Sequence, residues 1–284
     1  MSVDSIFLKK IFISFSYWNA MENTDASTNE DLELKNKPEL GQHFLIDKKA
    51  IEKTVLESNL SKEDKVIEVG AGKGALTEGL AAKSGEVLAF EIDEKLKPFL
   101  EVIEKKHKNL NIVYGDALKF SWEGYNKIVS NSPYALAEPI IKKSIEANVD
   151  ELILIVGEKF KYVVLENKSK AGVVTNLFFD FKPITEIKKE SFSPMPRVDS
   201  WLVRLQRKRK ILKEERILQG IVLKKGKIKN AIINSLVSEG MTKNQSRDLL
   251  NKMNLHDDVL NKSVGSITGR VLEEIKKSLK SQVL

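Results

Sequence analysis

Short apolar runs alternate with amphipathic stretches through the first two thirds of the chain. Continuous runs rich in β-branched and aromatic residues are typical of strands buried on both faces of a parallel sheet. This pattern predicts strands over residues 66–69, 86–92, 111–114, 127–130 and 151–156. Apolar positions at helical spacing predict helices between them, over residues 46–58, 75–80, 94–106 and 137–147. Strands that alternate with helices predict an α/β fold with a doubly wound, mostly parallel, Rossmann-like sheet.

The pattern changes in the last third of the chain. Residues 173–181 and 201–205 are two further strand candidates, and strand signals almost stop after Arg204. From residue 214 onward apolar positions recur at helical spacing, with interruptions at glycines and at residues 251–256. This part therefore predicts several short helices.

These changes divide the sequence into three parts. We expect residues 1–36 to be a disordered N-terminal extension, because the apolar run at 11–18 is interrupted and the residues from 19 onward are polar and acidic. A signal peptide is the alternative, although no small-residue cleavage site follows the apolar run near the start. Residues 37–206 would form the α/β domain, and residues 207–284 a small all-helical C-terminal domain.

Composition narrows the class of protein. The chain has 284 residues, of which 42% are hydrophobic, and no run of 18 apolar residues, so we expect a soluble protein without a membrane segment. It has no cysteine, which excludes disulfides and cysteine-based zinc sites and fits a cytoplasmic location. We also expect a monomer. The net charge of +7 permits a polyanionic partner such as RNA, or a basic surface that is merely solvated.

A glycine-rich turn is the first sign of a ligand site. Residues 66–77 read VIEVGAGKGALT, a strand pattern that breaks into glycines and continues as a helix. Such a turn lets backbone N–H groups approach a nucleotide-like ligand. Glu91 ends the next predicted strand, 21 positions after Gly70, where an acid can bind ribose hydroxyls. NAD, FAD and S-adenosylmethionine all fit this far, but Gly74 lies one residue too early for the dinucleotide fingerprint.

Polar residues follow the third and fourth predicted strands. Asp116 would accept a hydrogen bond from an adenine amino group, or would cap a turn. The fourth strand ends in Asn131-Ser132-Pro133-Tyr134. The Asn131 carbonyl, with a neighbouring backbone carbonyl, can accept both hydrogens of an exocyclic amine, and the Tyr134 ring can stack on a base. An ordinary loop is the alternative, but the position at a strand end favours a substrate site.

Taken together, these motifs resemble the ribosomal RNA adenine N6,N6-dimethyltransferase family, which is related to the erythromycin-resistance methylases. The matching segments are GQHFL at 41–45, VIEVGAGKGALT at 66–77, FEID at 90–93, GDAL at 115–118, NSPY at 131–134 and FSPMPRVDS at 192–200. The resemblance covers residues 40–204 well and the helical tail loosely. It implies a class I S-adenosylmethionine-dependent methyltransferase that dimethylates adenines in small-subunit ribosomal RNA during ribosome biogenesis.

The resemblance also implies roles for individual residues. The S-adenosylmethionine pocket would be lined by His43, Leu45, Gly70, Gly72, Glu91, Asp116 and Asn131. The catalytic residues would be Asn131, which orients the target amine, and Tyr134 and Phe192, whose rings would enclose the adenine. The implied reaction is a direct in-line transfer of the sulfonium methyl group to N6, repeated once, without a metal.

Two departures from the family pattern leave the substrate side open: Gly157 and Lys159 stand where the family has Gln and Glu. Ser132 also replaces an apolar residue of the pattern, a tolerable change because its backbone makes the hydrogen bond. The alternative function is therefore a catalytically weakened or inactive relative that acts as an RNA-binding ribosome-assembly factor. Basic runs at 207–210 and 224–229 would contact RNA phosphates under either function, or form a solvated charged surface.

Overall fold

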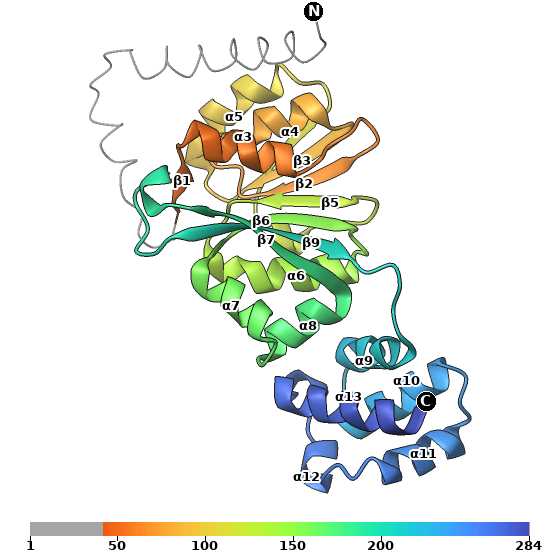
Figure 1. Cartoon of the computed structure of the whole chain (residues 1–284). Coiled ribbons are helices and arrows are strands. Elements are labelled where there is room, and N and C mark those ends of the chain that lie inside the picture. Colours follow the sequence, from red (N-terminus) through yellow and green to blue (C-terminus); the bar gives the residue numbers. More distant parts are fainter. Residues whose placement is uncertain (1–41, 284) are drawn as a thin grey trace, which may run out of the picture.

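The computed structural model describes residues 42–283, with the side chains described up to residue 281. The expectations for residues 1–36 and for the glycine at position 41 lie outside this part. Within it, a central sheet has the strand order β4-β3-β2-β5-β6-β9-β7 (Figure 1). In that order the strands are Leu110–Tyr114, Glu86–Glu91, Lys65–Val69, Lys127–Ser130, Glu151–Gly157, Ser200–Arg207 and Phe179–Ile187.

Neighbouring strands from β4 to β6 are parallel, whereas β9 runs antiparallel to both of its neighbours. The chain leaves β2 toward β3 and β4 on one side and later returns to place β5 on the other side. The strand order therefore reverses between β2 and β5, and the carboxyl ends of these two strands flank the crevice where α/β sheets bind ligands. This architecture confirms the predicted mostly parallel, doubly wound fold.

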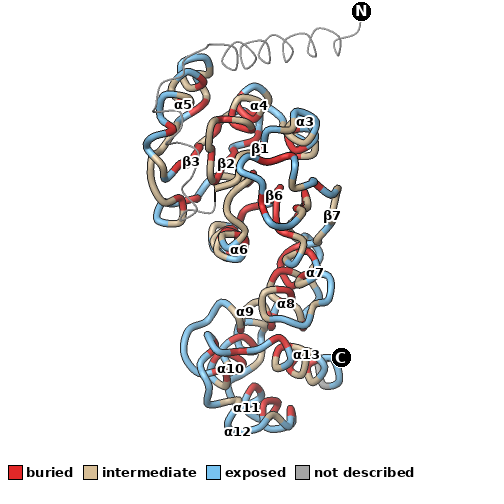
Figure 2. The backbone as a smooth tube through the Cα atoms, turned by 90° about the vertical axis from the view of Figure 1, so that its left-hand side faces the viewer, coloured by how far each residue is buried: buried red, intermediate tan, exposed pale blue. Residues whose placement is uncertain are grey.

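Helices cover both faces of the sheet (Figure 1). One face carries α3 (Lys48–Glu57), α4 (Thr77–Lys83) and α5 (Lys97–Glu104), and the other carries α6 (Ala137–Glu146), α7 (Glu158–Glu166) and α8 (Lys170–Phe178). Successive β2 residues serve opposite faces: Val66 belongs to the apolar cluster under α3–α5, and Ile67 to the cluster over α6 and α8. The strands are therefore buried on both sides, which Figure 2 shows as buried backbone between the layers.

The predicted strand over residues 173–181 is correct for 179–181 and wrong for 173–178. Residues up to Phe178 form the end of α8, and the strand β7 begins at Phe179. Ser169 caps this helix by accepting a hydrogen bond from the Gly172 N–H. The segment resembles a strand in the sequence because Val173, Leu177 and Phe178 are apolar. In the structure these residues are buried in a helix, and an apolar run of this length fits a buried helix equally well.

The C-terminal part is helical, as predicted. Its helices are α9 (Lys213–Leu223), α10 (Ile228–Ser238), α11 (Lys243–Lys252), α12 (Asp257–Leu260) and α13 (Gly269–Val283). Buried residues of α9 and α13 share one apolar cluster with α8, so these helices pack on the layer that covers the sheet (Figure 1). The boundary between two domains at residues 206 and 207 remains a prediction. Among the described helices, none is long and apolar enough to cross a membrane.

Candidate active site

A cleft of about 1290 Å³ opens at the carboxyl ends of β2 and β5. It lies at the point where the strand order reverses, as expected for a ligand site in this type of sheet. Every residue predicted for the site lines this cleft: His43, Leu45, Gly70, Gly72, Glu91, Asp116, Asn131, Tyr134 and Phe192. Their individual roles remain predictions, but the fold brings them together from segments spread over 150 residues.

Glu91 organises the glycine turn. Its Oε2 accepts a hydrogen bond of 2.8 Å from the Gly72 N–H, and its Oε1 accepts from the N–H groups of Ile92 and Asp93 at 2.8 and 2.9 Å. Gly72 has φ of +59°, a conformation that favours glycine. A carboxylate offers about four acceptor positions. Three are used here, so Glu91 can hold the turn and still accept from one ligand hydroxyl.

Two further acids line the cleft beside Glu91. Asp116 Oδ1 caps the turn after β4 by accepting from the Leu118 N–H at 3.0 Å, so the capping interpretation of this residue is correct without excluding a ligand contact. Glu68 lies in β2, is 1% exposed, and its Oε2 has no hydrogen-bond partner among the described residues. A buried polar atom without a partner on a cleft wall is one that a polar ligand group would satisfy.

A short two-stranded sheet closes one side of the cleft. β1 (Phe44–Leu45) pairs antiparallel with β8 (Phe192–Ser193), and Phe44 lies opposite Ser193. His43 Nδ1 makes a 2.7 Å hydrogen bond with the backbone carbonyl of Pro194. These contacts join the GQHFL and FSPMPRVDS motifs, which are far apart in the sequence, into one wall.

Asn131 connects this wall to the sheet. Its Nδ2 donates to the backbone carbonyl of His43 at 3.4 Å, a long bond that leaves Oδ1 as the acceptor of the side chain. Ser130 Oγ donates a 2.8 Å hydrogen bond to Ser132 Oγ. Ser132, which departs from the family pattern, is therefore fixed to the last residue of β5. A Cβ added to Gly70 would lie 3.3 Å from Ser132 Cβ. The glycine turn and the NSPY loop are therefore in close contact.

The two aromatic residues are held differently. Tyr134 begins a turn of 3-10 helix after β5, and its Oη lies 2.6 Å from Ser200 Oγ in β9. Burial is the main factor that raises the pKa of Tyr134 above its ordinary value, so its hydroxyl stays protonated at neutral pH. Phe192 is 3% exposed and lines the cleft from β8.

The sequence interpretation missed Glu68 and Ser200. Glu68 had a signal, since it is an acid within the apolar run VIEV. Ser200 ends the FSPMPRVDS motif, but nothing in the sequence pairs it with a tyrosine 66 positions earlier.

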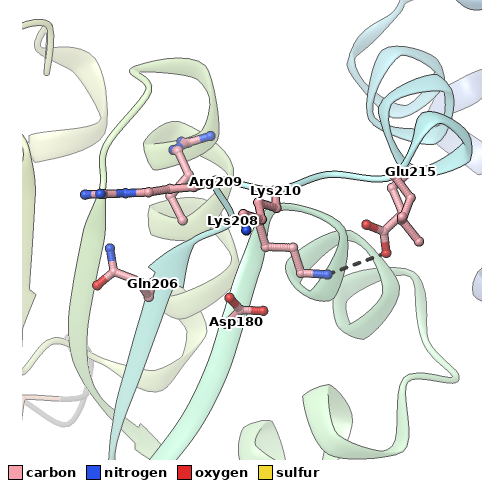
Figure 3. A pocket seen from close by; sticks show the side chains of 8 residues that line it. Asp180, Gln206, Lys208, Arg209, Lys210 and Glu215 are labelled. Carbon is pink, nitrogen blue, oxygen red and sulfur yellow. Dashed lines mark ion pairs between the residues drawn. The ribbon is translucent and has the colours of Figure 1, made fainter.

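A second concave surface lies at the junction of β9 and α9 (Figure 3). This groove, of about 710 Å³, includes the basic run at 207–210 together with Asp180, Gln206, Leu212 and Glu215. Arg207 is used structurally, because its Nε donates to the Val149 carbonyl at 2.6 Å. Lys208 pairs with Glu215 at 3.6 Å, the dashed contact in Figure 3. For Arg209 and Lys210 no ion pair is found within the described part of the chain, so these two residues remain for an external anion.

Comparisons with known proteins agree with this geometry. A family described as ribosomal RNA adenine dimethylase matches residues 33–268. A Methanococcus maripaludis (strain C7) protein, named a probable ribosomal RNA small subunit methyltransferase A, is 32% identical over 234 residues, which are 78% of this chain and 89% of that protein.

Solved structures show the same fold. A dimethyladenosine transferase from Plasmodium falciparum aligns with a TM-score of 0.59 at 20% identity, over 85% of this chain and 99% of that one. The 23S rRNA methyltransferase ErmE aligns with a TM-score of 0.57 at 21% identity, over 84% and 99%.

Proposed function

The chain belongs to the ribosomal RNA adenine dimethylase family, and from this membership we propose that it methylates N6 of adenines in small-subunit ribosomal RNA, with S-adenosylmethionine as the methyl donor. The observation that carries the proposal is the convergence of the glycine turn, the NSPY loop and the FSPMPRVDS segment on one cleft. Each motif alone is compatible with other ligands. Together they supply a donor side and a base side next to each other.

The donor side would hold S-adenosylmethionine, which supplies an electrophilic methyl group when bound. Glu91 has one acceptor position left for a ribose hydroxyl, and Asp116 follows β4 where it can meet the adenine ring of the cofactor. His43, Leu45, Gly70 and Gly72 complete this wall. The carboxylates of Glu91 and Asp116 also give the cleft negative charge, which suits a cationic ligand.

On the base side, Asn131 Oδ1 would accept a hydrogen bond from the target amine and orient its nitrogen toward the methyl group. Tyr134 and Phe192 would enclose the adenine. No strong base is required, because the amine loses its proton as, or after, its nitrogen becomes positively charged. Positioning would then supply most of the rate acceleration.

The RNA contact would extend beyond the cleft. Arg209 and Lys210 belong to the basic linker, residues 208–212 between β9 and α9, and line the groove of Figure 3. They are the side chains that we propose to contact phosphates there. The comparisons give no support to the alternative of an inactive RNA-binding relative.

The proposal is tested by incubating the protein with radiolabelled S-adenosylmethionine and a small-subunit particle that lacks the modification. We expect label in N6-methylated adenine, and a protein that binds the cofactor but never labels RNA would contradict the proposal. Asn131→Ala should lower the turnover at least about 100-fold, as expected for loss of a positioned polar group, while RNA binding persists. Asn111→Ala, at an exposed position in β4, is the matched control and should keep full activity.

A further inference from the structure

Tyr134 packs against one pair of residues in the sheet, the last residue of β6 and the first residue of β9. Gly157 and Ser200 are register partners in this antiparallel pair. Ser200 is fully buried, and its Oγ makes the 2.6 Å hydrogen bond to Tyr134 Oη. Gly157 lies beneath the ring itself: a Cβ built there would be 2.9 Å from Tyr134 Cδ2, 3.2 Å from Cε2 and 3.3 Å from Cγ.

The need for glycine at position 157 comes from the ring and not from the backbone. Gly157 has φ of −65° and ψ of 151°, which any residue adopts easily. A Cβ would, however, lie closer to Tyr134 Cδ2 than packed side chains allow, and its contacts with Cε2 and Cγ would also be tight. Any larger residue at position 157 would therefore displace the Tyr134 ring.

Lys159, which also departs from the family pattern, is exposed on α7. Of the departures at positions 157 and 159, Gly157 is the one that affects the cleft, and it does so through Tyr134. The hydrogen bond between Tyr134 Oη and Ser200 Oγ fixes the tip of the ring, and the absence of a side chain at Gly157 sets how deeply the ring lies.

We propose that Gly157 and Ser200 are positioning residues that together set the depth and orientation of the Tyr134 ring on the base side of the cleft. This inference rests on the proposed function, in which Tyr134 stacks on the target adenine. Under this inference, the glycine at position 157 changes the shape of the base pocket and does not abolish activity.

The kinetic test compares Gly157→Ala with Gly79→Ala. Gly79 in α4 is a matched control, because a Cβ there would meet Val55 Cγ2 at 2.8 Å, a similar clash far from Tyr134. We expect Gly157→Ala to lower kcat/KM for the RNA about 10- to 100-fold, with the dissociation constant of S-adenosylmethionine unchanged. Equal losses in both variants would mean general loosening and would overturn the proposal.

The hydrogen bond is tested with Ser200→Ala, Tyr134→Phe and the double variant. Both single substitutions remove the same bond, so the double variant should lose no more activity than either single one. Ser200→Thr keeps the hydroxyl and should recover part of the activity lost in Ser200→Ala. Additive losses, or no recovery, would contradict a positioning role for Ser200.

A stability measurement separates this inference from the proposed function. Gly157→Ala should lower the Tm of the wild-type protein but not that of Tyr134→Ala, in which the ring that it clashes with is gone. A lowered Tm in both backgrounds overturns the positioning role, even if the enzyme is active. If the wild-type protein does not transfer methyl groups, the proposed function is overturned instead. The Tm comparison still decides whether Gly157 positions the Tyr134 ring.

Discussion

Glu68 is an acid buried in the middle of a β-strand. It is 1% exposed and its Oε2 has no partner among the described residues. Burial raises the pKa of Glu68 from 4.5 to about 8, the Thr77 hydroxyl opposes this rise, and the Glu91 carboxylate adds to it. At neutral pH Glu68 is therefore mostly protonated in the folded protein, and ionised when the chain unfolds.

This difference predicts a pH-dependent stability. Between pH 4.5 and about 8 the unfolded chain loses the Glu68 proton while the folded protein keeps it, so the free energy of unfolding should fall as the pH rises through this window. The full effect is at most about 5 kcal/mol. In Glu68→Gln, which has no proton to lose, this part of the decline should be absent. Urea unfolding at pH 5 and pH 8 measures it.

Glu63→Gln is the matched control, because Glu63 precedes the same strand but is exposed. It should follow the pH profile of the wild-type protein. If Glu68→Gln also follows that profile, Glu68 is not protonated in the folded protein over this pH range, and the prediction is wrong.

The site residues differ in how far the sequence predicts them. Gly70, Glu91 and Asn131 were predicted because each belongs to a motif whose position relative to a strand end can be read along the chain. The roles of Gly157 and Ser200 depend on the register between β6 and β9 and on where the Tyr134 ring lies against it. Such contacts between distant segments have no local sequence signal.

At the scale of secondary-structure elements, α7 and α8 are in backbone contact at one glycine, Gly172. A Cβ at Gly172 would overlap the backbone carbonyl oxygen of Val163, which has little freedom to move. Gly172→Ala should therefore lower the free energy of unfolding by about 1–3 kcal/mol, the usual cost of overpacking. Chemical denaturation measures this change.

Gly220→Ala is the control for the same substitution in a helix. A Cβ at Gly220 of α9 would meet the Ser235 side chain, with Oγ at 2.7 Å and Cβ at 3.1 Å, whereas the close contact at Gly172 is with backbone. The Ser235 hydroxyl can rotate away, so Gly220→Ala should cost less stability than Gly172→Ala. Similar losses for both variants would show that the α7–α8 contact is not the cause.

The parallel strands and the helices between them were predictable, because continuous apolar runs and amphipathic stretches have different periods. The boundary of α8 and β7 was not, since apolar residues continue across it, six of them among residues 173–181. Their structure is decided by the C-terminal helices that pack on α8, and the sequence does not specify those contacts locally.

At the scale of the whole molecule, the cleft and the basic linker lie at opposite ends of the sheet. β9 begins at Ser200, beside the cleft, and ends at Arg207, where the linker starts. Its eight residues span roughly 24 Å at about 3.4 Å per residue. An RNA that reaches both places must therefore be long enough to follow this edge of the molecule.

Replacing Arg209 and Lys210 by alanine should weaken binding of a long structured RNA and reduce the slope of log K against log salt by about 1.4–1.8, the value for two phosphate contacts. Methylation of a short RNA that occupies only the cleft should be unchanged. Filter binding at several salt concentrations measures the slope.

Lys105→Ala with Lys108→Ala is the charge-matched control. These residues precede β4, at the same end of the sheet but at its opposite edge. An equal change of slope in both double variants would mean that the linker attracts RNA only through its net charge.

The reversal of strand order between β2 and β5 also bears on how such proteins diverge through evolution. The residues proposed for the donor side all occur at or before Asn131, and those proposed for the base side at or after it. β2, β3 and β4 precede this point in the chain, while β6, β7, β9 and the C-terminal helices follow it. Mutation or recombination after residue 131 therefore reaches the RNA side and leaves the donor strands intact. Descendants of one ancestor can acquire new RNA targets while inheriting the same methyl donor.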